Sequence, residues 1–508
     1  MKINLIDFFE ETVAKHPAKT AVVDQDRALT FEELKEKAKF LAGILAEKSG
    51  QVNRPIAVFL PKSVNAVLAD LAITYTNNIF MNLDIKMPFE RINNILDTIK
   101  PALIITNREQ GQRLQGVDKD YLKIINIDEL SFSEIDIRSP SPARIKMVDT
   151  DPFCIINTSG STGTPKGVVL NHRSFIDYTV WAVETFNFNG EETLGVLSPL
   201  VFDHYVYEIC LMMTKGSTLI LIPPSLSSFP IKILEILKRH QVNYIFWVPT
   251  IMVNIANMDL LSKIELPELK MVWFAGEVFP TKQFNYWRRQ LPQATFVNLY
   301  GPTEITVDCT FYVVERHIAD QEPIPIGRAR RNCDVLVLND QNQPITKGEE
   351  GELCVRGSSL AMGYYNNPDK TVMAFVQNPL NNSYPELVYR TGDIVTENDH
   401  GELVFKGRRD TMIKHLGYRI ELSEIEHVII NHLSLVKNGC AVYQPQRQQI
   451  VFFYEGPRGM SAGDFRKAIG RSLPKYMVPS LYCHVKQLPR TSSGKIDRLS
   501  LNQKSAEL

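Results

Sequence analysis

The stretch TSGSTGTPKG, residues 158–167, has a composition suited to binding an anion. It holds five hydroxyl side chains, three glycines, one proline and one lysine in ten positions. Glycines allow backbone conformations closed to other residues, so successive N–H groups can converge on one anion. The hydroxyls add donors, and Lys166 adds a positive charge. We therefore expect a phosphate-binding loop, although the spacing does not fit the motif G-x-x-x-x-G-K-[ST].

The flanking residues bear on how this loop would hold phosphate. An apolar run, FCIIN, precedes the loop as an expected strand, and a helix is expected to follow near HRSFIDYTVWAVETF. Phosphate at such a junction would also gain from the N–H groups at the helix N-terminus. The alternative is a flexible surface loop rich in serine and glycine. The ordered mixture of glycine, hydroxyl and lysine favours the phosphate loop over that alternative.

Four further stretches follow the loop along the chain, namely NLYGPTE (298–304), YRTGD (389–393), GRRDTMIKHLGYRIELSEIE (407–426) and LPRTSSGKID (488–497). Together the five motifs resemble those of the adenylate-forming superfamily. That group contains acyl-CoA synthetases, nonribosomal peptide synthetase adenylation domains, D-alanine–carrier protein ligases and firefly luciferase. The resemblance runs over essentially the whole chain. It implies that a carboxylate attacks the α-phosphate of ATP, giving an acyl adenylate and pyrophosphate, before the acyl group passes to a thiol.

The resemblance also implies sites for Mg²⁺ and for the ribose of ATP. Glu304 matches the magnesium ligand of the family, with Thr158 or Thr162 near it. A hard cation prefers oxygen ligands, and one carboxylate plus phosphate oxygens suffices. Asp393 matches the carboxylate that accepts both ribose hydroxyls, and Arg408 is expected to help hold the ribose. The alternative for Arg408 is a solvated charge.

The adenine site follows from the same motifs. Tyr300 matches the residue that stacks on adenine, although a tyrosine taken alone is more often a packing residue. Asn298 matches the residue that reads the amino edge of the base, and the backbone at Gly276 and Glu277 would cover the other face. The full set of residues expected to contact the nucleotide is Thr158, Ser159, Gly160, Ser161, Thr162, Gly163, Lys166, Gly276, Glu277, Asn298, Tyr300, Gly301, Thr303, Asp393, Arg408 and Lys495.

Three residues are expected to act in catalysis. Lys495 matches the lysine that bridges the substrate carboxylate and the α-phosphate, and Lys166 would act on the phosphates from the loop. Gly417, in KHLGYRIE, matches the loop that faces the thiol acceptor in the second half-reaction. The loops of Lys495 and Gly417 cannot occupy the active site together, so the C-terminal domain is expected to swing about a hinge near Asp410.

The stretch FDHYVYE (202–208) bears on which acid is activated. In amino-acid-activating members an aspartate in a similar stretch binds the substrate α-ammonium, and Asp203 matches it. A buried carboxylate needs a cationic partner, which an ammonium supplies. The alternative is that Asp203 caps a helix after PLVF. GYRIELSEIE also resembles carrier-loading members more than CoA ligases.

The substrate pocket implied by this resemblance is lined by Asp203, His204, Tyr207, Phe246, Trp273, Ala275, Leu299, Val307 and Asp308. Several of these side chains are bulky, which favours a small substrate. Asp308 is a second acid that would prefer a hydroxyl or a cation on the substrate, because a buried carboxylate is costly without a partner. GEVFP (276–280) resembles the D-alanine ligases, whose substrate is small and apolar. Small polar, longer basic and small apolar substrates therefore all stay open.

The elements that position these residues are those of an α/β protein. Helical periodicity over 29–50, an apolar strand at 55–61 and a second strand at 101–107 predict layered, mostly parallel sheets flanked by helices. Further strands are expected at 217–224, 243–249, 271–276 and 294–301, followed by short strands after about residue 320. We expect a large N-terminal AMP-binding domain over 1–409 and a small α+β domain over 410–508.

Composition restricts the functional class. The chain has 508 residues with 56 basic and 57 acidic side chains, which does not favour a nucleic-acid partner. It has no apolar run long enough to span a membrane, and its seven scattered cysteines predict free thiols in a cytoplasmic protein.

Three functions remain open at this point. The first is a free-standing amino-acid-activating enzyme that uses ATP and Mg²⁺ and loads a phosphopantetheinylated carrier protein in trans. The second is a CoA ligase for a small acid, with the same fold but another acceptor, and Asp203 distinguishes these two. The third is a nucleotide-binding relative without activity, against which Glu304, Asp393, Lys495 and Gly417 together argue.

Overall fold

The computed structural model describes residues 2–25, 27–114, 116–117, 122–132, 147–159, 165–409, 411–455, 460–490 and 496–506. The chain divides into two compact units in this structure. The first unit comprises residues 1–85, 101–156 and 167–409, and the second comprises residues 86–100, 157–166 and 410–508. The boundary expected at residue 410 thus describes only part of the division, because two short earlier segments group with the C-terminal residues.

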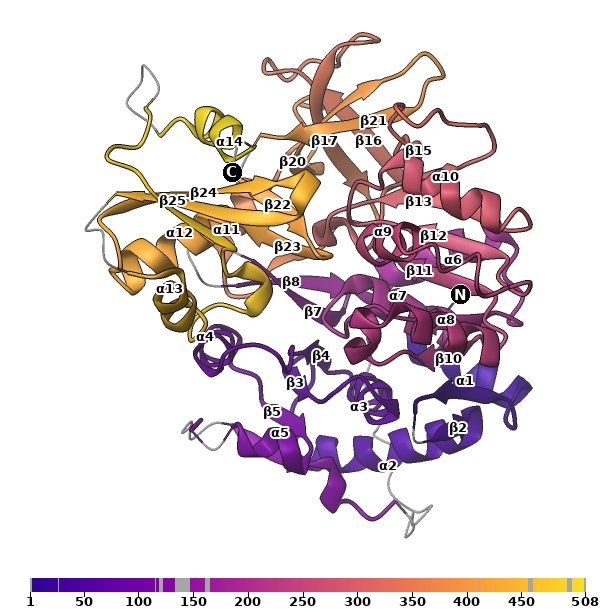
Figure 1. The fold of residues 1–508 in the computed structure, drawn as a ribbon. Coiled ribbons are helices and arrows are strands. Elements are labelled where there is room, and N and C mark those ends of the chain that lie inside the picture. Colours follow the sequence, from indigo (N-terminus) through magenta and orange to yellow (C-terminus); the bar gives the residue numbers. More distant parts are fainter. Residues whose placement is uncertain are drawn as a thin grey trace. The chain divides into compact units, whose positions relative to one another are not determined.

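The largest sheet of the first unit contains nine strands among the described residues (Figure 1). Its central strands run parallel, and the strands at both edges are antiparallel to their neighbours. In sheet order the strands are β15 (Arg328–Ala329), β14 (Thr310–Val313), β13 (Thr295–Tyr300), β12 (Met271–Phe274), β11 (Tyr244–Trp247), β9 (Thr193–Val196), β10 (Thr218–Leu221), β1 (Thr20–Val23) and β2 (Ala28–Thr30).

A second sheet contains seven strands in the described part of the chain. It is parallel from β7 to β6, and β18 pairs antiparallel with β8. Its strands in order are β18 (Gly363–Tyr364), β8 (Lys166–Asn171), β7 (Pro152–Thr158), β4 (Ile79–Asn82), β3 (Pro55–Phe59), β5 (Leu103–Thr106) and β6 (Lys123–Asn126).

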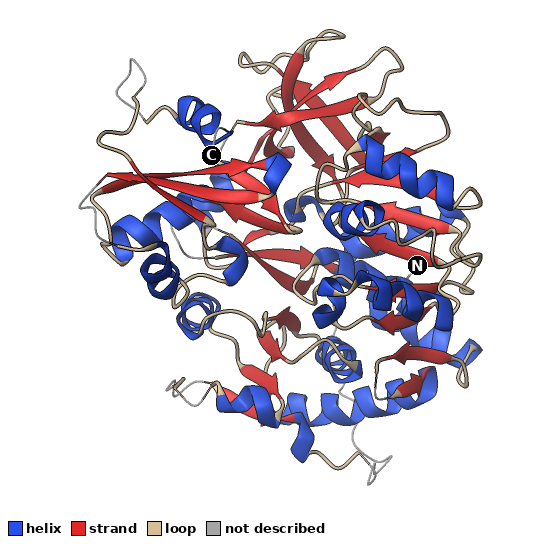
Figure 2. Ribbon diagram, in the orientation of Figure 1, coloured by secondary structure: helices blue, strands red, loops and turns tan. Residues whose placement is uncertain are grey.

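Helices alternate with these strands along the first unit (Figure 2). The helix α2 shows how sequence sets the boundaries, because Thr30 and Glu33 form a capping box at its start and Gly50 ends it with a left-handed φ of 61°. The helices are α1 (Leu5–Lys15), α2 (Phe31–Ser49), α3 (Val64–Tyr75), α5 (Arg108–Gln112), α6 (His172–Phe186), α7 (Asp203–Lys215), α8 (Pro230–Arg239), α9 (Pro249–Asn257), α10 (Thr281–Gln290) and α11 (Pro368–Ala374), with short turns η1 (Ile127–Glu129), η2 (Pro224–Ser228) and η3 (Thr303–Ile305).

Two hydrophobic cores explain why the central strands are apolar on both faces. The first core joins α1, α2, α3, α6 and α7 with residues of both sheets. The second core joins α8, α9 and α10 with the other face of the nine-stranded sheet. Along β11, Tyr244 and Phe246 belong to the first core, while Ile245 and Trp247 belong to the second. Side chains alternate along a strand, so a strand buried on both faces reads as one apolar run.

A third sheet of the first unit is antiparallel, with five strands among the residues described. This arrangement agrees with the short strands expected after residue 320. The strands are β16 (Cys333–Leu338), β17 (Glu350–Gly357), β20 (Leu387–Glu397), β19 (Phe375–Gln377) and β21 (Leu403–Arg408). The predicted α/β class with layered, mostly parallel sheets is confirmed.

The second unit is an α+β module. Its elements are α4 (Phe89–Ile99), β22 (Met412–His415), β23 (Tyr418–Glu421), α12 (Leu422–His427), the π-helical turn η4 (Val428–His432), β24 (Asn438–Gln444), η5 (Pro445–Arg447), β25 (Gln449–Glu455), α13 (Ala462–Ile469), η6 (Lys475–Met477), β26 (Leu481–His484) and α14 (Arg498–Ala506). Arg91 of α4 forms a buried ion pair with Glu424 of α12. Glu90 pairs with His432 at 2.6 Å and accepts a 2.7 Å hydrogen bond from Ser472. These contacts explain why α4 groups with this unit.

None of the described helices combines the length and apolar composition needed to cross a membrane. The seven cysteines are free thiols, and six of them are buried.

A buried carboxylate in the first unit gives a prediction about stability. Asp70 of α3 is 1% exposed and accepts hydrogen bonds from Tyr205 Oη at 3.0 Å and Asn82 Nδ2 at 3.2 Å. Burial raises the pKa of Asp70 from 3.8 to about 7, although both hydrogen bonds oppose this shift. The folded state therefore keeps a proton that the unfolded chain releases between these two values.

We accordingly expect Asp70→Asn to be more stable than the wild type at pH 8, by up to roughly 4 kcal/mol, and to show little difference near pH 4. The reason is that the free energy of unfolding of the wild type falls as pH rises from about 4 to above 7, whereas asparagine has no proton that titrates in this range. Urea unfolding at both pH values measures the difference. Asp399→Asn, at a side chain that is 98% exposed, is the control. An equal difference at both pH values would show that the Asp70 carboxyl does not titrate abnormally.

Candidate active site

The predicted pocket residues on the central strands share one face of the nine-stranded sheet. Phe246 of β11 lies opposite Trp273 of β12, which lies opposite Val297 of β13. All three belong to the first core, as do Ala275 and Leu299, which lie two positions further along their strands. Alternate residues of a strand point to the same face, and the register of the three strands then places these side chains together.

Asp203 is the first residue of α7, and it is 5% exposed. The residue that caps this helix is Phe202, which makes no side-chain capping bond, so the capping alternative for Asp203 is wrong. The Asp203 carboxylate accepts a hydrogen bond from the backbone N–H of His204 at 3.0 Å, and its Oδ1 lies 3.3 Å from His204 Nδ1. A negative charge is stabilised at the first turn of a helix. In the described part of the chain, no lysine or arginine forms an ion pair with Asp203.

Aromatic contacts join α7 to these strands. The ring centroids of His204 and Phe246 lie 4.4 Å apart, and those of Phe246 and Trp273 lie 5.5 Å apart. Tyr207, one turn after Asp203, stacks on Trp273 at 5.8 Å with ring planes 4° apart. The structure therefore brings together four of the predicted pocket residues, and the aspartate begins the helix that carries two of them.

Asp308, the second predicted acid, is 1% exposed and has a partner inside the protein. Its Oδ2 accepts a hydrogen bond of 2.9 Å from Tyr178 Oη of α6. The sequence-based expectation that a substrate group would satisfy this carboxylate is thus incomplete, because a tyrosine 130 positions earlier already donates to it.

The backbone leading to Asp308 is held in an unusual conformation. Thr306 and Val307 have left-handed φ values of 59° and 63°, which β-branched residues rarely adopt. Thr306 Oγ1 donates to the carbonyl of Ser359 at 2.9 Å. A side chain on Gly301 would place its Cβ 2.5 Å from Asp308 Cα, so only glycine allows this close approach. Strain of this kind persists where surrounding structure fixes it, often at functional sites.

The predicted ribose group forms a connected network. Tyr300, at the end of β13, donates its hydroxyl to Asp393 Oδ2, and Arg408 donates to Asp393 Oδ1. Asp393 of β20 and Arg408 of β21 are register partners, and Arg408 also donates to the carbonyl of Thr391 at 2.9 Å. Burial first, and then the Asp393 carboxylate, raise the pKa of Tyr300 well above its usual value, so this hydroxyl stays a donor.

The residues expected to surround adenine lie at the ends of neighbouring strands. Asn298 of β13 donates its amide to the carbonyl of Pro325 at 2.7 Å. Gly276, two residues after the end of β12, has a φ of 92°, and Glu277 accepts from the N–H and hydroxyl of Thr250 at the start of α9. The ends of parallel strands are where such sheets bind ligands.

The carboxylate of Glu304 is the kind of ligand that Mg²⁺ prefers. It lies in η3 with Thr303, is fully buried, and accepts a 2.8 Å hydrogen bond from Tyr364 Oη. Within the described ranges, no group of three or more histidine, cysteine, aspartate or glutamate side chains is arranged to hold a metal ion. Mg²⁺ bound through one carboxylate and phosphate oxygens needs no such group, so these residues fit the ion.

The elements that flank the predicted phosphate-binding loop differ in part from the expectation. The strand β7 precedes it as expected, but the strand β8 follows it, and α6 begins only at His172. The loop thus joins two strands, so no helix N-terminus follows it directly, whereas the helix expected near HRSFIDYTVWAVETF is confirmed as α6 (His172–Phe186). The apolar run VVL after Lys166 was the sequence signal for this strand.

Part of this loop can be placed within the second unit. Thr158 Oγ1 donates to the carbonyl of Lys166 at 3.4 Å. Ser159 Oγ donates to the carbonyl of Arg419 at 2.8 Å and accepts from the N–H of Glu421 at 3.2 Å. Ser159 therefore bonds to the backbone of two residues of β23, Arg419 and Glu421. The predicted residues Gly160, Ser161, Thr162 and Gly163 lie outside the described residues.

Of the residues predicted to act in catalysis from the C-terminal part of the chain, the structure describes Gly417. Gly417 and Leu416, with φ values of 82° and 54°, form the tight turn between β22 and β23. Leu416 is 43% exposed at this turn. Lys495 and Asp410 lie outside the described residues, so their roles stay predictions.

One residue near the site was missed by sequence reasoning. Lys62, three residues after β3, donates to the carbonyls of Val196, Leu197 and Ser198 at 3.0, 2.8 and 3.2 Å. It therefore ties the end of β9 to the other sheet, just before the segment that leads to Asp203. The sequence around Lys62 does not indicate this contact, because the backbone carbonyls that accept from it lie more than 130 positions further along the chain.

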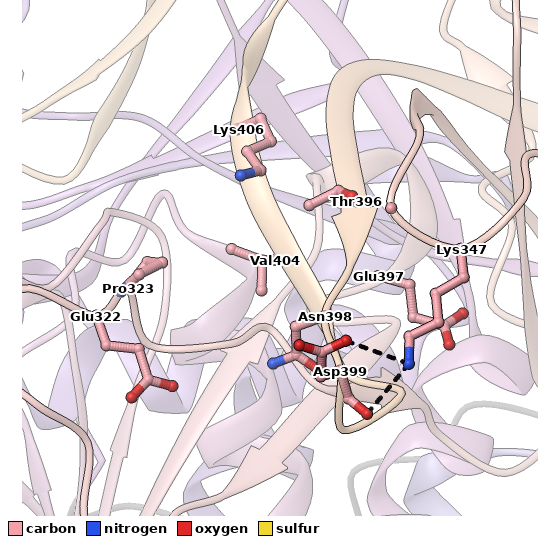
Figure 3. Close-up of a pocket in the computed structure, with 10 residues that line it drawn as sticks. Glu322, Pro323, Lys347, Thr396, Glu397, Asn398, Asp399, Val404 and Lys406 are labelled. Carbon is pink, nitrogen blue, oxygen red and sulfur yellow. Dashed lines mark hydrogen bonds and ion pairs between the residues drawn. The ribbon is translucent and has the colours of Figure 1, made fainter.

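A surface cavity of about 530 Å³ lies on the antiparallel sheet (Figure 3). Its lining includes Glu322, Thr396, Asn398 and Lys406. Lys347 Nζ there donates to the Asp399 carbonyl at 3.3 Å. None of the predicted site residues lines this cavity, so we assign it no role in the chemistry.

The layered sheets and the buried groups at their strand ends define a nucleotide-using enzyme of the adenylate-forming class. Residues 9–365 match the model of the AMP-binding enzyme family, and the chain belongs to this family. It is an ATP-dependent, AMP-forming ligase.

Relatives of known sequence include zwittermicin A synthase ZmaJ of Bacillus cereus, which is 30% identical over 506 residues, covering 96% of this chain and 93% of ZmaJ. Gramicidin S synthase 1 of Brevibacillus brevis is 28% identical, and the match covers 97% of this chain but only 44% of that relative. The chain thus spans less than half of the larger synthase.

Solved structures share the fold. The adenylation domain AlmE of Vibrio cholerae, in complex with glycyl-adenosine-5'-phosphate, superposes with a TM-score of 0.84 at 24% identity, covering 100% of this chain and 98% of AlmE. The o-succinylbenzoate CoA synthetase MenE of Bacillus subtilis gives a TM-score of 0.85 at 20% identity, covering 98% of each chain.

Proposed function

We propose that the chain activates an amino acid with ATP, releasing pyrophosphate, and then transfers the aminoacyl group to the phosphopantetheine thiol of a separate carrier protein. The observation that carries the proposal is the buried Asp203 carboxylate at the start of α7, on the helix whose His204 and Tyr207 contact Phe246 and Trp273. A buried carboxylate with no lysine or arginine partner among the described residues suits the α-ammonium of an amino acid.

The comparisons support the same class of substrate. AlmE is an adenylation domain in complex with a glycyl adenylate, and PA1221 is a nonribosomal peptide synthetase protein that contains adenylation and carrier domains. The seven free thiols favour a reducing, cytoplasmic setting for the reaction.

In the proposed mechanism, Asp393 and Arg408 hold the ribose and Tyr300 lies against adenine. Asp203 orients the amino acid, so that its carboxylate approaches the α-phosphate. Lys495 neutralises charge between the two reacting groups, because the transition state spreads negative charge over phosphoryl oxygens. Glu304 would hold Mg²⁺, which when bound neutralises charge on the departing pyrophosphate.

A CoA ligase for a small acid is the second candidate. The similarity to MenE favours it, and so does His204, because its Nδ1 lies 3.3 Å from Asp203 Oδ1 without a hydrogen bond and gives the carboxylate a polar neighbour other than a substrate ammonium. In that case Asp203 would have no partner on the substrate.

Amino-acid-dependent ATP–pyrophosphate exchange tests the proposal, with each proteinogenic amino acid, D-alanine and simple acids. We expect strong exchange with one amino acid and a rise in its KM of about 50-fold in Asp203→Asn, because a charged contact worth about 2–3 kcal/mol is lost. Asp399→Asn, at an exposed position, should match the wild type. Exchange with simple acids alone, unaffected by Asp203→Asn, would exclude the proposal and leave CoA as the acceptor to test.

A further inference from the structure

A polar network that the chemistry described above does not use holds the predicted pocket acid Asp308. Tyr178 is fully buried, and its hydroxyl donates to Asp308 Oδ2 at 2.9 Å. Its ring meets the ring of the pocket residue Tyr207 edge-on, with centroids 4.9 Å apart. Burial first, and then the Asp308 charge, raise the pKa of Tyr178 well above its usual value, so the hydroxyl remains a donor. Tyr178 thus contacts both an acidic and an aromatic residue of the predicted pocket.

Arg330 also restrains Asp308, through a hydrogen bond to the backbone carbonyl of that residue. The side chain of Arg330 is 1% exposed, and its Nε donates to the carbonyl oxygen of Asp308 at 3.0 Å. Its Nη1 donates to Asp177 Oδ2 at 2.7 Å, so its charge is paired within the protein. The guanidinium carbon lies 5.3 Å from the centre of the Tyr178 ring, which adds a cation–π contact.

The backbone on both sides of Asp308 is also restrained. The backbone N–H of Arg330 bonds the carbonyl of Cys309 at 2.9 Å, and that of Cys309 bonds the carbonyl of Tyr300 at 2.8 Å. The left-handed residues Thr306 and Val307 and the close approach of Gly301 to Asp308 Cα also restrain the backbone at Asp308. A packing role would not require a buried carboxylate, because burying charges costs more than burying apolar groups of similar size. The free-energy cost of burying the Asp308 carboxylate is explained if the carboxylate has to face a substrate group at a defined position.

We propose that Tyr178 and Arg330 are positioning residues that fix Asp308 in the substrate pocket and thereby set which side chain the enzyme prefers on its acid substrate. This inference rests on the proposed function, since that function places Asp308 in the pocket. Neither residue contacts the reacting atoms in this assignment. Binding groups must be held within a narrow range of geometry to discriminate between substrates, and neighbouring hydrogen bonds supply that restraint.

Tyr178→Phe is the direct test, because it removes one hydroxyl and keeps the ring contacts. The chain offers a matched control in Tyr205→Phe, since Tyr205 is also fully buried and donates its hydroxyl to a buried carboxylate, Asp70, at 3.0 Å. Both variants lose one hydrogen bond to an aspartate, so losses of stability should be similar. Asp70 is not part of the predicted pocket, so only Tyr178→Phe should alter substrate choice.

The measurement is the KM and kcat of ATP–pyrophosphate exchange for every acid that the wild type accepts, with the KM for ATP alongside. For Tyr178→Phe we expect the KM of the preferred acid to rise about 10-fold, while kcat and the KM for ATP stay within about twofold, because the lost bond to a charged acceptor is worth about 1.5 kcal/mol. The ratio of kcat/KM between acids with different side chains should also shift. Arg330→Lys, which keeps the charge but loses the planar fork, should shift this ratio in the same direction.

A double-mutant cycle with Asp308→Asn separates positioning from general loss of packing. If Tyr178 acts through Asp308, Tyr178→Phe should change the KM by less than about twofold in the Asp308→Asn background. Full additivity of the two changes, or equal effects of Tyr178→Phe and Tyr205→Phe on substrate ratios, would overturn the inference. If the wild type accepts only simple acids, the proposed function fails, and the same ratios among those acids still decide whether Tyr178 positions Asp308.

Discussion

Asp393→Asn is expected to lower kcat/KM for ATP about 100-fold while leaving the KM for the acid substrate within about twofold. In the structure, Asp393 Oδ2 accepts from Tyr300 and Oδ1 accepts from Arg408. A carboxylate can accept about four hydrogen bonds, so two positions remain for the two ribose hydroxyls. Asparagine offers one acceptor oxygen and no charge, and losing two charged contacts of about 1.5 kcal/mol each corresponds to about 100-fold.

Steady-state exchange at varied ATP concentration measures this effect. Asp334→Asn provides the control, because Asp334 also pairs with an arginine of the antiparallel sheet, Arg356, but is 50% exposed. The control should change kcat/KM for ATP by less than about twofold. A loss in Asp393→Asn that appears equally in the KM for the acid would point to a disturbed sheet instead of a lost ribose contact.

Lys495→Ala is expected to slow adenylate formation by about 100- to 1000-fold and to spare transfer from a supplied adenylate to the thiol. The lysine is predicted to neutralise charge that develops only while the acyl–phosphate bond forms, and losing one such electrostatic contact typically costs this much. Lys495 itself lies outside the described residues. Its neighbour Ile496 forms an antiparallel bridge with Arg490, and Asp497 N–H donates to the carbonyl of Pro489 at 2.8 Å, so the following residues are anchored.

Two assays separate the half-reactions. Pyrophosphate release reports on the first, and consumption of a chemically prepared acyl adenylate in the presence of the thiol acceptor reports on the second. Lys504→Ala, in α14 of the same unit, controls for a general loss of positive charge. Equal losses in both assays would place Lys495 in a structural role.

The sequence was most informative where periodicity and motifs are local. The strands β3, β5, β11, β12 and β13 and the helix α2 lie where alternation, apolar runs and caps indicated. The resemblance to the family supplied the pocket residues, and strand alternation explains only why residues two positions apart, such as Val297 and Leu299, share a face. Family motifs supplied the remaining candidates, such as Asp393 and Glu304.

Contacts between distant parts of the chain were not predictable in the same way. Tyr178 and Asp308 are 130 positions apart, and Lys62 reaches backbone carbonyls more than 130 positions away. Nothing in the local pattern around either residue indicates a partner, because the partner is selected by the arrangement of two sheets. The strand β8 was not predicted, although the apolar run VVL directly follows Lys166 and Gly167.

The alternation of β11 and β12 between two cores has a consequence for how such an enzyme changes over evolutionary time. Phe246 and Trp273 belong to the core that contains the predicted pocket, whereas Ile245, Val272 and Phe274 belong to the core under α8, α9 and α10. Substitutions that reshape the pocket therefore leave the packing of the opposite face in place. Substrate choice and the integrity of the sheet are encoded by interleaved but separate sets of positions, so one set can vary while the other is kept.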